Sequence, residues 1–148
     1  APGPDEFALD DDPWSCAPLG SSWTVTTTTT TSTRTAGSPS LFCFSVSRNF
    51  GPEPEILAFQ HESRAGIFGC DETAVFCTGP LTVGEGHEAV DAIRFADAPV
   101  GRSRDGTAGN ALLFMHVWDA VSREGRWMSS DWTVKADPDA VILPDRLR

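Results

Sequence analysis

Short apolar runs, separated by polar and glycine-containing segments, dominate the chain from residue 41 onward. Residues 41–46 are nearly all apolar and β-prone, which predicts a central strand covered on both faces of a sheet. Further strands are expected at 67–70, where acidic residues follow, at 74–77 and, as a minor strand, at 93–95.

Residues 53–63 carry a proline near the start and acidic residues in the first turn, which predicts a short helix. Ile56, Phe59 and Gln60 are expected to lie on one face of this helix.

Residues 108–123 form the clearest predicted helix, with Thr107 as its cap and Gly125 as its stop. Apolar residues recur there at steps of three and four, so they are expected to face the core: Ala111, Phe114, Met115, Trp118 and Val121.

A last strand begins at Trp132 and leads into Asp137-Pro138-Asp139. Because proline gives no amide hydrogen to a sheet, the strand should stop at residue 136 or 137 and hold both carboxylates in a rigid turn. Two carboxylates so placed suit Mg²⁺ or Mn²⁺, which are typically bound by one or two carboxylates and the phosphates of a substrate. A solvated turn without metal is the alternative, since Asp and Pro are common turn formers.

The order of these elements is strand, helix, strand, an irregular region, helix and strand. It predicts an α/β fold with a mostly parallel sheet and helices on both faces. In such sheets ligands bind beyond the carboxyl ends of the strands, where this order would place Arg48, Asp71, Asp137 and Asp139.

Residues 1–40 differ in composition from the expected folded domain at 41–148. Residues 1–23 are acidic and contain proline, as in a leader or the tail of an upstream module. Residues 24–40 are rich in Thr and Ser without apolar alternation, which predicts a disordered linker that would accept O-glycans in a secreted chain. The domain at 41–148 is expected to be truncated at its C-terminus.

The net charge of −10 argues against nucleic acid as a partner, because binding to phosphates needs clustered basic residues. No apolar run is long enough to span a bilayer, so no membrane segment is expected within this chain. Cys16, Cys43, Cys70 and Cys77 lack C-x-x-C spacing, which argues against structural zinc and leaves their pairing open. Their even number favours an oxidising compartment, with buried free thiols as the alternative.

The segment Asp131-Trp-Thr-Val-Lys-Ala-Asp-Pro-Asp-Ala-Val-Ile-Leu-Pro-Asp-Arg-Leu-Arg148 resembles the metal-site segment of β-1,3-glycosyltransferases of the fringe and core 1 galactosyltransferase type. In those enzymes a Trp-x-x-Lys-Ala-Asp-Asp-Asp strand precedes a Val-Ile-x-x-x-x-Leu-Arg helix start. The strand at 41–46, the acid-ended strand at 67–72 and the Arg-rich turn and helix at 102–118 follow the same order. Residues 41–148 also resemble uncharacterised secreted algal proteins with a Trp-Thr-Val-Lys-x-Asp-Pro-Asp-Ala-Val segment.

The resemblance implies an incomplete GT-A core, the nucleotide-sugar-binding half of a glycosyltransferase, in the Golgi lumen or outside the cell. Asp137 and Asp139 would hold Mn²⁺ or Mg²⁺ against the diphosphate of a UDP-sugar, and the acceptor would be a glycan or glycoprotein. The same resemblance assigns nucleotide-sugar contacts to Asp71, Arg102, Arg104 and Lys135.

Pro138 replaces the middle aspartate of the family motif, which keeps the two outer carboxylates but stiffens the loop. The acceptor-binding half and the general base would lie after Arg148. The first hypothesis is therefore a metal-dependent hexosyltransferase or a fragment of one. The alternative is a non-catalytic secreted α/β module in an extracellular assembly, with Asp137 and Asp139 in a plain turn or a Ca²⁺ contact.

Overall fold

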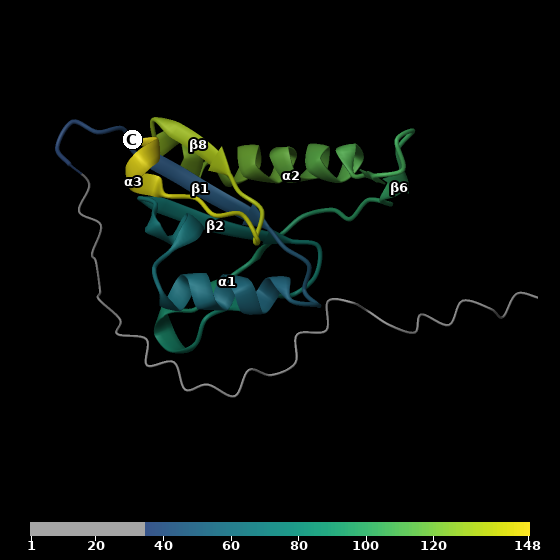
Figure 1. The fold of residues 1–148 in the computed structure, drawn as a ribbon, viewed down its shortest axis with the longest axis horizontal. Coiled ribbons are helices and arrows are strands. Elements are labelled where there is room, and N and C mark those ends of the chain that lie inside the picture. Colours follow the sequence, from purple (N-terminus) through teal and green to yellow (C-terminus); the bar gives the residue numbers. More distant parts are fainter. Residues whose placement is uncertain (1–34) are drawn as a thin grey trace, which may run out of the picture.

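A four-stranded parallel sheet forms the centre of the computed structural model, which describes residues 35–148 (Figure 1). The strands lie in the order β5-β2-β1-β8, and β1 pairs in parallel with β2 on one side and with β8 on the other. Their bounds are Leu41–Val46 for β1, Glu72–Cys77 for β2, Ile93–Arg94 for β5 and Trp132–Lys135 for β8. The prediction of an α/β fold with a mostly parallel sheet is confirmed.

The two long helices cover opposite faces of this sheet, α1 (Glu53–Glu62) on one and α2 (Ala111–Glu124) on the other (Figure 1). Two small hairpins lie outside the sheet: β3 (Thr82–Val83) with β4 (Val90–Asp91), and β6 (Gly101–Arg102) with β7 (Ala108–Gly109). The remaining helical turns are η1 (Gly66–Gly69), η2 (Gly86–Glu88), η3 (Arg126–Ser129) and α3 (Pro144–Leu147).

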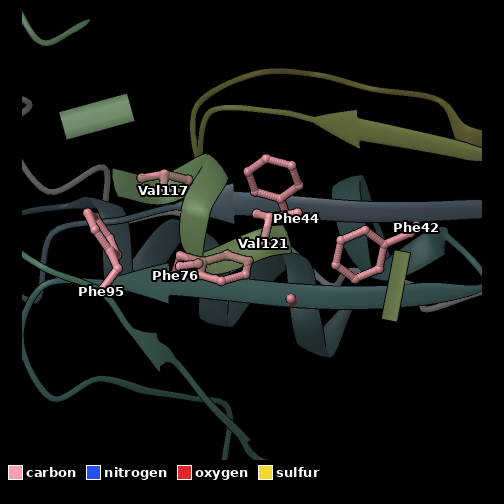
Figure 2. Close-up of a cluster of buried hydrophobic side chains, with 8 residues drawn as sticks. Phe42, Phe44, Phe76, Phe95, Val117 and Val121 are labelled. Carbon is pink, nitrogen blue, oxygen red and sulfur yellow. The ribbon is translucent and has the colours of Figure 1, made fainter. Parts of the chain in front are cut away.

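Each face of the sheet has its own apolar core, because successive side chains of a strand point to opposite faces. Phe42 and Phe44 of β1 point toward α2, together with Phe76 of β2 (Figure 2). The rings of Phe44 and Phe76 meet edge to face, with their centroids 5.6 Å apart. Leu41 and Cys43 point to the other face, where Leu57 of α1 is fully buried. β1 is thus covered on both sides, as its continuous apolar sequence predicted.

The prediction of a strand at 67–70 is wrong. These residues form the 3-10 helix η1, and the Cys70 amide donates to the Ile67 carbonyl at 3.1 Å. Gly66 turns the chain with a φ of +57°, so that Ile67 fills the α1-side core without joining the sheet. The second strand is the stretch after it, β2, which begins with the acidic residue Glu72 and does not end in acids.

Both helices are confirmed, but their predicted apolar faces are partly wrong. In α2 the buried residues are Val117, Ala120 and Val121, whereas Met115 is 63% and Trp118 46% exposed. A helix on a sheet buries a single stripe, and the outer part of the predicted apolar face extends past that stripe.

The ends of α2 and the face of α1 also differ from the predictions. α2 begins after Asn110 rather than Thr107, and it ends at Gly125, whose φ of +77° is left-handed as expected of a helix stop. In α1 the buried residue is Leu57, and Phe59 is 64% exposed.

The chain after β8 returns along the α1 side of the sheet. Ala140 and Ile142 pack against the core there, and Arg148 ends beside Asp71, with Nη2 of Arg148 2.9 Å from Oδ2 of Asp71. The Arg148 side chain is only 6% exposed and also pairs with Asp145.

The acidic segment 1–23 and most of the Thr-rich tract 24–40 lie outside the described residues. Within residues 35–148, no helix is long and apolar enough to cross a membrane.

Candidate functional site

A pocket of about 890 Å³ opens beyond the carboxyl ends of β1 and β8. The chain leaves β1 toward β2 on one side of the sheet and later returns through α2 to β8 on the other side. The connections therefore diverge between β1 and β8, and such switch points are where open α/β sheets bind ligands. The volume lies within the range of sites for drug-sized molecules and cofactors.

The turn at residues 137–139 forms one wall of this pocket. β8 ends at Lys135, and both Asp137 and Asp139 are exposed while Pro138 is buried between them. The Pro138 carbonyl accepts a hydrogen bond of 2.7 Å from Nε2 of Gln60 on α1, and the Ala140 amide donates to the Asp137 carbonyl at 2.9 Å. Both carboxylates are thus carried by a backbone that is held on both sides.

Lys135 neutralises part of this acidic turn. Its ammonium group forms an ion pair with Asp137 and lies 4.4 Å from the ring centroid of Phe114 on α2. Asp139 makes no hydrogen bond or ion pair with another part of residues 35–148. One carboxylate is therefore paired with a cation of the protein itself, and the other is open to solvent.

The loop between β1 and α1 forms the facing wall. Arg48 is held by Glu53 through Nε and Nη2, at 3.0 and 2.8 Å from Oε1, while its backbone amide donates to Oε2 at 2.8 Å. The Arg48 guanidinium lies 5.5 Å from the ring centroid of Phe50, which also lines the pocket. This wall is aromatic and well fixed, whereas the wall at 137–139 is acidic.

The start of α2 closes the pocket near the β6–β7 hairpin. Asn110 precedes the helix and gives no side-chain hydrogen bond to its first amides, and no acidic residue lies in the first turn. The helix itself therefore supplies no side chain that offsets the partial positive charge of its first turn.

Three of the residues predicted for nucleotide-sugar contacts lie elsewhere. Asp71 precedes β2 and lies at the amino edge of the sheet, where its carboxylate accepts hydrogen bonds from the Leu41 amide at 2.8 Å and from Arg148. The expectation that Asp71 lies beyond the carboxyl ends is wrong, because the acidic residues start a strand and do not end one. Arg102 and Arg104 are exposed on the β6–β7 hairpin and do not line the pocket.

The hairpin loop that carries Arg104 is organised by Asp105. Its carboxylate accepts hydrogen bonds from the Ser103 hydroxyl at 2.5 Å and from the Thr107 hydroxyl at 2.8 Å. These bonds stabilise the charged form and lower the pKa of Asp105 from 3.8 to about 2. Thr107, expected as the cap of α2, belongs to this loop.

Phe50 and Gln60 were not predicted as site residues. Phe50 lies between Asn49 and Gly51 in the turn after the first strand, and an aromatic residue at such a position is a usable signal. Gln60 gives no such signal, since it lies 78 residues from the carbonyl that it binds.

Mg²⁺ and Mn²⁺ need oxygen ligands, and one or two carboxylates are enough where a substrate supplies phosphate oxygens. Asp137 and Asp139 are two such groups on one rigid turn. No group of three or more His, Cys, Asp and Glu side chains with metal-ligand placement occurs within residues 35–148. A cation at this turn would take two carboxylate ligands from the protein and its other oxygen ligands from a bound phosphate.

Comparison of the chain with protein-family models, with curated proteins and with solved structures gives no match.

Proposed function

We propose that residues 41–148 bind the diphosphate of a nucleotide-sugar donor through a divalent cation held by Asp137 and Asp139. The chain would then be a glycosyltransferase, or the donor-binding part of one. The observation that carries this proposal is the position of the two carboxylates, which follow β8 directly at the switch point of a parallel sheet and line its pocket.

The surrounding groups suit a diphosphate. A bound Mn²⁺ or Mg²⁺ supplies charge neutralisation on the departing diphosphate. Lys135 would donate to a phosphate oxygen, and the place of its ammonium group in the pocket, beside Asp137 and over the Phe114 ring, supports this role. The start of α2, which has no acidic residue in its first turn, adds a second positive feature to the same pocket.

The expected acceptor is a glycan or glycoprotein, and the expected compartment is the secretory pathway or the extracellular space. The disulfide between Cys43 and Cys70 supports an oxidising compartment. The proposal gives no residue the role of general base.

Calorimetric titration of UDP into the purified chain tests the proposal, first with Mn²⁺ and then with a chelator in excess. We expect binding that requires the metal and is lost in the double variant D137N/D139N. The matched control is D119N, which removes one carboxylate from the exposed side of α2. Binding that persists in chelator, or that is equal in the double variant and the control, would contradict the proposal.

A second candidate is the non-catalytic secreted module. The ion pair between Lys135 and Asp137 favours it, because a turn aspartate with its own cationic partner has no need of a metal. This function predicts that Mn²⁺ changes neither UDP binding nor the thermal unfolding of the folded chain.

A further inference from the structure

Phe50 is a large apolar side chain that remains 65% exposed in the loop after β1. Single exposed apolar residues are common on protein surfaces and need no explanation. Phe50 differs because it lines the pocket that also contains Asp137 and Asp139. An aromatic ring at the mouth of a pocket offers a flat face to a ligand.

The ring is held in place from its own loop. Arg48 lies over it at 5.5 Å from the centroid, and Arg48 is fixed by its hydrogen bonds to Glu53. The neighbouring Asn49 packs closely on the backbone of the loop after β2. A Cβ atom added at Gly79 in that loop would lie only 2.5 Å from Nδ2 of Asn49. Binding to Phe50 would therefore cost little ordering of the protein.

We propose that Phe50 is the stacking platform for the nucleobase of the donor, an inference that rests on the proposed function. The nucleobase is the flat, aromatic part of such a donor, and the Phe50 wall is its chemical match. Pro52, Ile56 and Val100 line the pocket with Phe50, and the charges on this wall, Arg48 and Glu53, pair with each other. The facing wall carries Lys135 and the 137–139 turn. A nucleoside diphosphate divides in the same way, with an aromatic ring at one end and phosphates at the other.

The sugar of the donor is less suited to this wall, because its hydroxyl groups need polar partners and the Arg48 and Glu53 side chains there already bind each other. Stacking of a base on an aromatic side chain is worth about 1–3 kcal/mol by alanine substitution. Removing the ring is therefore expected to weaken UDP binding by roughly 5- to 150-fold.

Titration of two ligands into the full chain in the presence of Mn²⁺ separates this inference from the proposed function. Pyrophosphate carries the phosphates alone, and UDP adds the nucleoside. We expect F50A to weaken UDP binding by the factor above and to leave pyrophosphate binding unchanged, while F50W keeps the affinity for UDP. The matched control is F59A, since Phe59 is 64% exposed but does not line this pocket.

Each outcome has one meaning. If neither ligand binds with Mn²⁺, the proposed function falls and the inference falls with it. If both ligands bind to the unchanged chain and F50A affects neither, or affects both equally, the nucleobase assignment alone is overturned. Free hexose that binds with the same dependence on Phe50 would also overturn it, because the platform would then serve the sugar.

Discussion

Reduction of the disulfide between Cys43 and Cys70 is expected to destabilise the fold strongly. The two residues are 27 apart in the sequence, and the bond joins the middle of β1 to the end of η1. Closing a loop of this length lowers the entropy of the unfolded chain, which in the chain-entropy model stabilises the native state by about 3.5 kcal/mol at 25 °C. Cys43 is fully buried, so the reduced thiol keeps its packing and the effect comes mainly from the unfolded state.

Urea unfolding followed by tryptophan fluorescence, with and without a reductant, measures this difference. With an m-value of about 1.5–2 kcal/mol/M, the midpoint should fall by roughly 2 M on reduction. The double variant C43A/C70A should unfold near the reduced protein and should no longer respond to the reductant.

The cysteine content of the chain supplies the control. Cys77 is a buried free thiol, and Cys16 lies outside the described residues. The variant C16S is expected to keep both the midpoint and the response to reductant. Equal midpoints in oxidised and reduced protein would refute the reasoning, and so would a C16S variant that no longer responds.

Three further outcomes follow from single contacts. V117A should lower the free energy of unfolding by about 2–3 kcal/mol because the side chain is buried, whereas M115A should lower it by less than about 1 kcal/mol. Equal losses of stability for the two variants in urea unfolding would contradict the burial pattern. Q60A removes the hydrogen-bond donor to the Pro138 carbonyl and should lower the free energy of unfolding by about 1–3 kcal/mol. It should also weaken metal-dependent UDP binding, and an unchanged affinity by calorimetry would show that the turn does not depend on this hydrogen bond. The pKa of Asp105 is about 2, so the stability that this carboxylate adds to its hairpin is present above pH 4 and lost as the pH falls toward 2. An NMR titration of its carboxyl carbon with a midpoint near pH 4 would contradict this.

The central strand could be predicted because it is a nearly continuous apolar run, as in a parallel sheet covered on both faces. The last strand could be predicted because it starts with the β-prone residues Trp132, Thr133 and Val134. The run at 67–70 is also apolar, like a buried strand. Gly66 turns the chain there, and the disulfide from Cys70 to Cys43 of β1 holds the run outside the sheet. Only the fold shows this difference. The error at 67–70 also placed Asp71 at the wrong edge. As the residue after a strand it would lie at the carboxyl edge of the sheet, but as the residue before β2 it lies at the amino edge.

The face of α2 shows a different limit. Periodicity identified which residues share a side of the helix, but not how wide a stripe the sheet covers, so Met115 and Trp118 were expected in the core. In the candidate site, Asp137 and Asp139 were found because a strand runs directly into them. Gln60 was not, since its role depends on a contact between segments far apart in the chain.

The return of the C-terminal tail to the amino edge of the sheet has a practical consequence for binding experiments. Ser40 enters the fold there beside Asp131, and Arg148 ends there against Asp71, at the terminus marked C in Figure 1. The pocket opens at the opposite edge of the sheet. Ser40 and Arg148 therefore both lie away from the site. A chain captured on a sensor surface through a tag after Arg148 presents its pocket to the flowing solution, whichever ligand is tested.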